Sequence, residues 1–388
     1  MKTVLSFINE ALRVKGGTKV ATGTKKTEFP ETKEELIKII QEIVKSRDKN
    51  SKDLINLNHI DVSKITDFKG LFSWGNRPPS LMRKITPGSN FSPGFYFNRM
   101  HNYKPSESVF YGLDYELGDL KFDFSEWDMS NATEVDFMFA GSNVECDISN
   151  WNLSNVEFMT GMFAHGNVQC DISKWNVSKV REMSLLFYYS DFDGDISKWN
   201  VSNVECMVGM FCFSGFDGDI SKWNVSKVKG MGYMFRRSYF DGDISNWDVS
   251  SVTDFTSMFS GSEFNQDISK WNVSAAKSFR RMFQKSSFDG DISDWDVSNA
   301  YSMEYMFYES EFTGKNGDIG KWKLKSIENV EEMFSKSKLE ISLDGWKHYL
   351  LKDFKICKCR HMFSEMKNPN FKEPKWFRIC VRAQRLDN

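Results

Sequence analysis

The sequence lacks the features by which most enzymes and charged-ligand binders are recognised. Its 51 basic and 53 acidic side chains leave a net charge of −2, so no bulk field favours nucleic acid or an anionic membrane. No glycine-rich loop opens a predicted helix in the pattern that cradles phosphates. The five histidines stand at no recognisable spacing from a nucleophile or an acid. We therefore expect a chain that is not an enzyme and that uses no cofactor.

Long apolar runs and an export signal are also missing. No apolar run approaches the length of a membrane span, and the stretch 4–12 is interrupted by Ser6, Asn9 and Glu10. We expect no membrane partner. The expected location is inside a cell or in a virion, with display on a cell surface as the less favoured alternative.

Cysteine is present but forms no framework. Seven cysteines are an odd number without a common spacing, which indicates reduced thiols. Cys146 and Cys170 hold the same position in adjacent repeats, where packing inside the core is the simplest role. The fragment 357–361, Cys-Lys-Cys-Arg-His, resembles part of a zinc motif with Cys380 as its one further candidate ligand. The sequence predicts no metal site there.

What the sequence does contain is a repeat with a constant period. Eight tryptophans from Trp127 to Trp295 lie 24 residues apart, and Trp322 and Trp346 follow after 27 and 24 residues. A disguised first repeat has Ile60 in place of tryptophan. Such a period predicts stacked supersecondary units, here eleven turns of a solenoid.

One repeat can be read from its tryptophan, taken as position 0. Apolar residues at −7 and −3 alternate with polar ones at −6, −4 and −2, which predicts a strand. Apolar residues at +2, +5, +8, +11 and +12, after a serine at +3, predict a short helix with that serine as N-cap. The expected fold class is an α/β solenoid on the leucine-rich-repeat plan. It is a right-handed coil of strand, turn and short helix with a parallel sheet on one face.

The segments outside the repeats are predicted to be helical or capping. Residues 3–13 read as a short amphipathic helix, and Thr32 opens a capping box before a second helix that caps the solenoid. Residues 376–381 resemble a closing strand. We divide the chain into an N-terminal helix and linker (1–27), a helical cap (28–56), the repeat solenoid (57–339) with an aromatic insertion (73–119), and a degenerate last repeat with a C-terminal cap (340–388).

Two surfaces are candidates for binding a partner. The insertion is rich in aromatic residues and prolines, and it is interpreted either as a folded packing loop or as a partner-binding loop. The exposed sheet face repeats charged residues in each turn. The candidate partner-binding residues are Asp193, Lys198, Asp217, Lys222, Asp241, Trp74, Phe95, Tyr96 and Tyr103.

The aspartates at position −4, represented by Asp195, Asp219 and Asp243, could stack along one face as calcium ligands. Lysines at −1 in the same turns could compensate them instead, and aspartates also bond backbone amides in turns. Structural roles are the favoured interpretation of these columns.

The repeat pattern Phe-Asp-Gly-Asp-Ile-Ser-Lys-Trp-Asn-Val-Ser, seen at 192–202, resembles the BspA-like leucine-rich-repeat proteins, also called the mycoplasma lipoprotein-type repeat family. The resemblance covers residues 57–363. It implies a leucine-rich-repeat fold and a role in adhesion or protein binding, often at a surface and often in gut bacteria and their phages. This sequence lacks the family's export signal and lipid-attachment cysteine.

The N-terminus is similar to capsid-targeting segments of tailed-phage internal head proteins, on residues 1–3, 7–11 and 13–15. That likeness implies packaging into a phage head and cleavage after Glu10.

The favoured hypothesis is a non-enzymatic scaffold that binds a protein partner through the sheet face and the insertion. A phage-encoded cargo or virion-associated protein acting on a host target is one alternative, and a calcium-stabilised surface adhesin is another. We expect a monomer. We do not expect nucleic acid as a partner, because the basic pairs 236–237 and 280–281 are interleaved with acidic residues.

Overall fold

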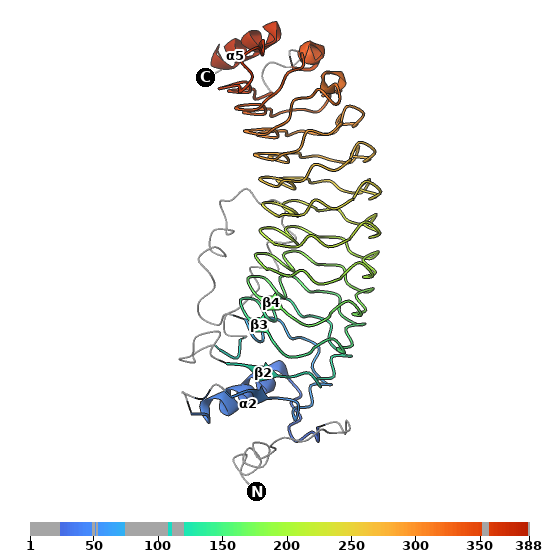
Figure 1. Cartoon of the computed structure of the whole chain (residues 1–388), viewed down its shortest axis with the longest axis vertical. Helices are drawn as coiled ribbons and strands as arrows, with labels where there is room; N and C mark the ends of the chain where they lie inside the picture. Colours follow the sequence, from blue (N-terminus) through green and yellow to red (C-terminus); the bar gives the residue numbers. More distant parts are fainter. Residues whose placement is uncertain are drawn as a thin grey trace.

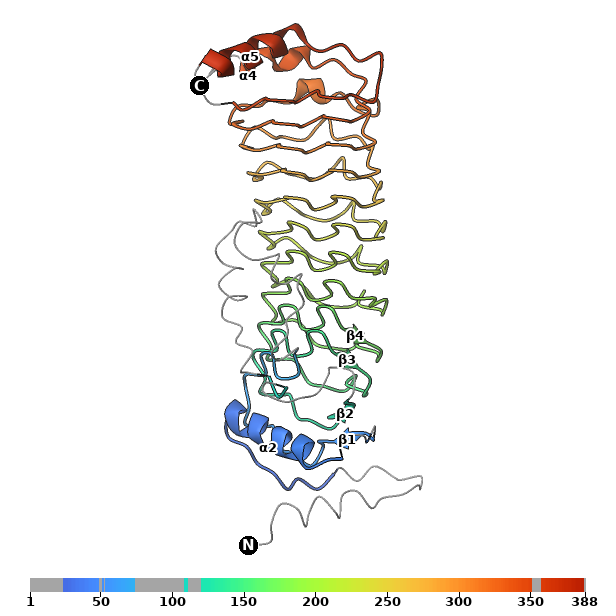
Figure 2. The same cartoon turned by 90° about the vertical axis from the view of Figure 1, so that its left-hand side faces the viewer.

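The computed structural model describes residues 24–48, 51, 53–73, 108–110, 120–350 and 357–386. The predicted helix 3–13 and the candidates Glu10, Trp74, Phe95, Tyr96 and Tyr103 lie outside these residues. The repeat units stack along the long axis of the molecule, between helix α2 (Lys33–Lys45) at one end and helix α5 (Lys375–Leu386) at the other (Figures 1 and 2).

The units are joined by one continuous column of parallel β-bridges. The column begins with Asp67 and Glu134, continues at intervals of 24 residues to Ser302, and ends with Asn329 and Lys358. The bridging residue follows the tryptophan, or Ile60 in the first unit, by seven positions in every unit except the last, where Lys358 follows Trp346 by twelve. The eleven bridging positions equal the number of turns expected from the sequence.

Aromatic columns fill the interior, as the repeat predicts. Each tryptophan indole N–H donates to the carbonyl at position −3 of the preceding unit, as from Trp199 to Ile172 at 3.0 Å and from Trp223 to Ile196 at 3.1 Å. The phenylalanines at +12 stack face to face, with 5.8 Å between the ring centroids of Phe187 and Phe211. These side chains are almost fully buried, as are the isoleucines at −3 and the methionines at +11, so these recurring apolar positions form the core.

Helix α2, Lys33–Lys45, is confirmed where the capping box predicts it. The Thr32 hydroxyl accepts the Glu35 N–H at 3.2 Å, and Leu36, Ile40 and Val44 are buried on one face. These three residues belong to the same apolar cluster as the repeats, so α2 packs on the first units.

Paired strands are shorter than expected. Strand β1, Ile55–Asn56, pairs in parallel with β2, Phe122–Asp123, and β3, Asn143–Val144, pairs in parallel with β4, Asn167–Val168. From Trp199 onward the described segments at −7 to −1 contain no assigned strand, so the predicted repeated strand is wrong for these units. In several of these units a side chain of the preceding unit accepts an amide that a strand ladder would pair with a backbone carbonyl: the Asp217 carboxylate accepts the Asp241 N–H, and the Asp289 carboxylate accepts the Thr313 N–H.

The predicted short helix at +3 to +12 is also wrong. The described repeats form a series of turns there, whose amides bond the next unit: Met207 N–H donates to the Gly230 carbonyl at 3.1 Å. Positions +10 and +14 have left-handed backbone, as at Leu185 (φ 58°) and Phe213 (φ 56°), which an α-helix cannot contain. The serine at +3 is not a helix N-cap either, since Ser202 donates its N–H to the Asn200 side-chain oxygen at 3.2 Å. We call residues +6 to +14 the turn ladder.

The C-terminal end is helical. Two 3₁₀ turns, η3 (Ile319–Lys321) and η4 (Asp344–Trp346), precede α4 (Lys347–Leu350) and α5 (Lys375–Leu386). The predicted closing strand is therefore wrong, because Trp376, Phe377 and Cys380 bury one face of a helix. The Trp376 indole N–H still donates to a carbonyl below it, that of Leu343 at 3.1 Å. No helix in the described ranges is long and apolar enough to cross a membrane.

Candidate interaction surface

The charged residues predicted to meet a partner lie at an exposed edge of the units. Asp193, Lys198 and Lys222 are exposed there, as are Asp217 and Asp241. Two of the aspartates also link units: the Asp217 carboxylate accepts the Asp241 N–H at 3.2 Å, and the Asp241 carboxylate accepts the Asn265 N–H at 2.9 Å. We call this set the Asp-Lys edge. Its role in binding a partner stays a prediction.

The calcium candidates at −4 each close a local turn. The carboxylates of Asp195, Asp219 and Asp243 accept the N–H of the serine two residues later, each at 2.9 Å. These bonds with serine hydroxyl and amide groups lower the pKa of all three carboxyls. Among the described residues no group of three or more His, Cys, Asp or Glu is placed to hold a metal ion. The geometry thus gives these aspartates a turn-forming role, and the calcium site stays a prediction.

The turn ladder presents a second set of side chains, which we call the outer surface. It consists of positions +10, +13 and +14 of each unit, whereas +8, +11 and +12 point into the main core. Five of its residues form a buried apolar cluster separate from that core, with Phe213 packed against it. The five are Ala164, Leu185, Tyr188, Cys212 and Tyr233. The described chain therefore buries apolar side chains on both sides of the turn ladder.

Aromatic rings form a row on the outer surface along the stacking axis. The rings of His165 and Tyr189 lie 5.1 Å apart and nearly parallel, and Tyr189 and Phe213 follow at 4.9 Å. Tyr189 is 46% exposed, so the row is open to solvent. Burial lowers the pKa of His165 to about 4 and raises the pKa of the Cys212 thiol to about 12.

Arginines continue this row. The Arg237 guanidinium carbon lies 5.4 Å from the Phe213 ring centroid, and that of Arg236 lies 5.6 Å from the Tyr233 centroid. Farther along the stack, Arg281 lies 4.9 Å from the Tyr305 ring. Such contacts stabilise each cation by roughly 0.5–1 kcal/mol at exposed sites and hold the planar groups in place.

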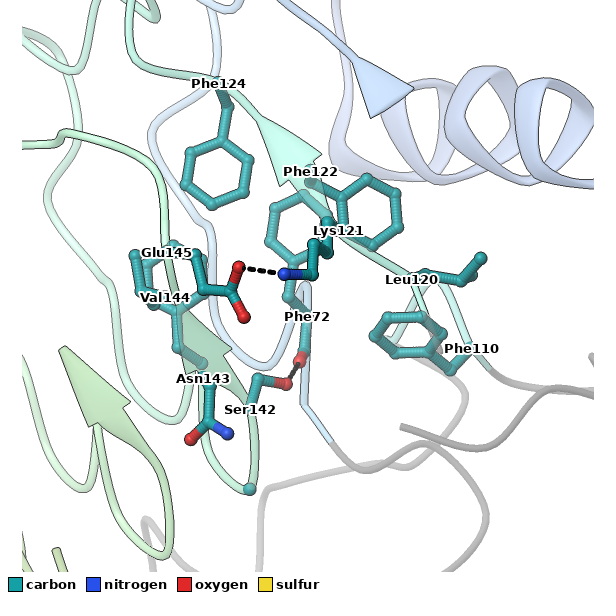
Figure 3. Close-up of a pocket in the computed structure, with 12 residues that line it drawn as sticks. Phe72, Phe110, Leu120, Lys121, Phe122, Phe124, Ser142, Asn143, Val144 and Glu145 are labelled. Atoms are coloured by element: carbon teal, nitrogen blue, oxygen red, sulfur yellow. Dashed lines mark hydrogen bonds and ion pairs between the residues drawn. The ribbon is translucent and has the colours of Figure 1, made fainter. Parts of the chain in front are cut away.

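A small pocket lies among the first units, beside Phe110 (Figure 3). Its volume is about 120 Å³, and phenylalanine rings line it together with polar groups such as Lys121, Asn143 and Glu145. Across the opening Lys121 pairs with Glu145 at 2.6 Å, and the Ser142 hydroxyl donates to the Phe72 carbonyl at 2.6 Å. An engineered cavity of about 150 Å³ accepts benzene, so the pocket is large enough for one side chain. Its lining offers that side chain both aromatic and polar contacts.

The cysteines are packing groups with one close pair. Cys146 and Cys170 are half-buried against the core, and burial raises the pKa of Cys146 to about 12. At the C-terminal end the Cys380 thiol donates to the Leu350 carbonyl at 3.9 Å, and interaction with Cys380 together with burial raises the pKa of Cys359. This contact joins α5 to the last unit.

The outer surface was missed as a site by sequence reasoning. Position +10 falls inside the segment predicted to be helical, and positions +13 and +14 follow directly after it, so the predicted helix does not bring the three positions together. The available signal was variation: +8, +11 and +12 repeat apolar residues, whereas +14 changes from His165 to Tyr189, Phe213, Arg237 and Gly261 in successive units. A position whose residue type varies from unit to unit, beside positions that stay apolar, is typical of a surface that is not needed for packing.

These features together define a repeat protein with a constant core and a variable outer surface. Four overlapping segments, residues 107–215, 164–262, 212–315 and 285–376, match the family described as Mycoplasma protein of unknown function, DUF285. The matches extend over residues 107–376, well over half of the chain, and the chain belongs to this family. It is a repeat family compatible with the BspA-like resemblance. No curated protein and no solved structure matches the chain.

Proposed function

We propose that this chain is a solenoid scaffold without catalytic activity that recognises a protein partner through its outer surface. The observation that carries the proposal is the row of rings and arginines on the outer surface, in which Tyr189 and Arg237 are exposed to solvent. Tyrosine and arginine are enriched among the residues that dominate binding energy at protein interfaces. The outer surface combines these residue types, whereas the Asp-Lys edge has exposed charges alone.

Two further features support recognition of a protein over a small molecule. The row of rings from His165 to Phe213 extends across three units, which makes a long, shallow surface. The pocket beside Phe110 has room for a single anchor side chain of the same partner. We propose that the insertion 73–119 contributes to the same partner and that the free protein is a monomer.

Site-specific photo-crosslinking tests the proposal. A benzophenone amino acid replaces Tyr189 on the outer surface in one variant and Lys198 on the Asp-Lys edge in the control variant. Both positions are exposed, so neither replacement disturbs the core. After irradiation in a lysate of the cells that contain the chain, we expect one discrete protein adduct from the Tyr189 variant.

Adducts from the Lys198 variant alone would move the site to the Asp-Lys edge. The absence of a protein adduct from either variant would refute protein recognition.

A further inference from the structure

The outer surface has only small side chains in the repeat unit that contains Trp247. Its outer residues, Ser257, Ser260 and Gly261, are all small. The preceding unit contributes Arg236 and Arg237, and the following unit contributes Arg281 and Lys285. Since neighbouring strands in a stack are about 4.8 Å apart, these two units lie about 10 Å from each other. Long cationic side chains therefore stand on both sides of a floor of small residues.

The arginine beside this floor is held against its neighbours. A Cβ added to Gly261 would lie 3.0 Å from Cγ of Arg237, so the arginine stem rests on the glycine backbone. Its guanidinium lies over Phe213 at the same time. A side chain fixed at both stem and tip loses less entropy on binding a ligand than a free one.

Positive charge is in excess here. Arg280 pairs with Glu304 at 3.0 Å and Lys285 with Glu309 at 2.9 Å. In the part of the chain that the structure describes, no ion pair is formed by Arg236, Arg237 or Arg281, and the buried Nε atoms of Arg236 and Arg281 have no hydrogen-bond partner.

The nearby acids do not cancel this excess. The Glu304 carboxylate already accepts hydrogen bonds from Arg280 and, at 3.2 Å, from the Asn329 side-chain amide. Arg281 is therefore the second cation that this one carboxylate attracts. Burial raises the pKa of Asp254, whose carboxylate accepts the Thr256 N–H at 2.9 Å. Arg280 and Lys285 are thus paired with carboxylates, whereas Arg236, Arg237 and Arg281 form no ion pair among the described residues.

We propose that the outer surface between Arg237 and Arg281 binds an acidic segment of the protein partner, with partner carboxylates seated on the guanidinium groups. This inference rests on the proposed function and names its partner chemistry. A guanidinium matches a carboxylate in a bidentate geometry, and the resulting bonds are stronger than neutral ones. Nucleic acid is the weaker candidate, because polymer binding needs a long basic stripe and the chain as a whole carries a charge of −2.

Fluorescence anisotropy on the full chain tests the inference with three labelled probes: oligoglutamate, oligolysine and oligothymidylate. The test variant is the double substitution Arg237→Gln and Arg281→Gln. The control variant is Lys198→Gln and Lys222→Gln, which removes the same charge from the Asp-Lys edge. A third variant, Arg237→Lys and Arg281→Lys, keeps the positive charge and removes the guanidinium groups that can form bidentate hydrogen bonds. Circular dichroism verifies that each variant is folded.

We expect the unmodified chain to bind oligoglutamate more tightly than either other probe. The glutamine variant should bind it about tenfold or more weakly, because two charged hydrogen-bonding groups are lost; tenfold corresponds to about 1.4 kcal/mol. The lysine variant should lie between the two, and the Asp-Lys edge control should bind like the unmodified chain.

Three outcomes would overturn the inference. They are equal affinity for oligoglutamate and oligolysine, tighter binding of oligothymidylate, and an equal loss in the Asp-Lys edge control. If the glutamine variant does not fold, full affinity in the lysine variant would contradict bidentate pairing. A protein adduct at Tyr189 together with no binding of oligoglutamate would retain the proposed function and reject this partner chemistry.

Discussion

Gly209 offers a substitution whose sign depends on which backbone the turn ladder has. In the helix predicted for +3 to +12, Gly209→Ala would stabilise the chain by about 1 kcal/mol, the difference in helix propensity between the two residues. In the structure Gly209 has φ +61°, and an added Cβ would lie 2.8 Å from Cδ2 of Leu185. Left-handed backbone costs alanine about 1–2 kcal/mol, and displacing the leucine costs about 0.5–1.5 kcal/mol more.

Part of this cost is offset, since alanine also lowers the entropy of the unfolded chain by an equivalent of about 0.4–1 kcal/mol. The net expectation is a destabilisation of about 1–2 kcal/mol, opposite in sign to the helical expectation. Urea unfolding followed by tryptophan fluorescence measures it, since many buried tryptophans report on the stack.

Gly215→Ala is the matched control, because a Cβ there meets its nearest atom at 3.9 Å and the backbone is not left-handed. It should be neutral or slightly stabilising. A rise in the unfolding midpoint of Gly209→Ala, or an equal fall in both variants, would refute the turn ladder.

Three further outcomes are expected. Trp223→Phe should lower the free energy of unfolding by about 1–3 kcal/mol, because the Ile196 carbonyl loses its buried donor; an unchanged urea midpoint would contradict this. Burial lowers the pKa of His165 from 6.5 to about 4, so its contribution to stability is complete above pH 6.5 and is lost as the pH falls toward 4. After solvent screening of this half-buried group, we expect the free energy of unfolding to fall by about 1 kcal/mol over this pH range. The fall should be absent in His165→Gln, and an NMR titration midpoint of His165 near 6.5 would contradict the lowered pKa. Cys212, whose pKa burial raises to about 12, should resist a thiol reagent at pH 8 until denaturant is added, and rapid labelling in the native protein would count against the outer apolar cluster.

The core could be predicted from the sequence because it depends on side chains that recur. The tryptophan period fixes which residues face one another in neighbouring units, and Thr32 with Glu35 marks the start of α2 by a local bond. In both cases the structure follows from residue types that are visible in the sequence.

The turn ladder could not be predicted because its cause is not in the side chains. Apolar residues such as Val225, Val228 and Met231 recur at intervals of three, which turns closed by bonds between residues i and i+3 produce as well as a helix does. Glycine usually marks positions with left-handed backbone, but here Phe213 and Arg237 occupy such positions. Because this segment was predicted to be helical, the outer surface was not predicted either. That Arg237 and Arg281 lie near each other can be recognised only from the register between units.

The left-handed positions have a consequence for how such proteins diversify. At +14 the backbone takes φ of 51–58° with histidine, tyrosine, phenylalanine, arginine, lysine and glutamate alike. Hydrogen bonds to the adjoining unit impose this conformation, so no particular side chain is required for it. Mutation can therefore exchange residues at these sites while the scaffold persists, and new specificities can arise without a search for new folds.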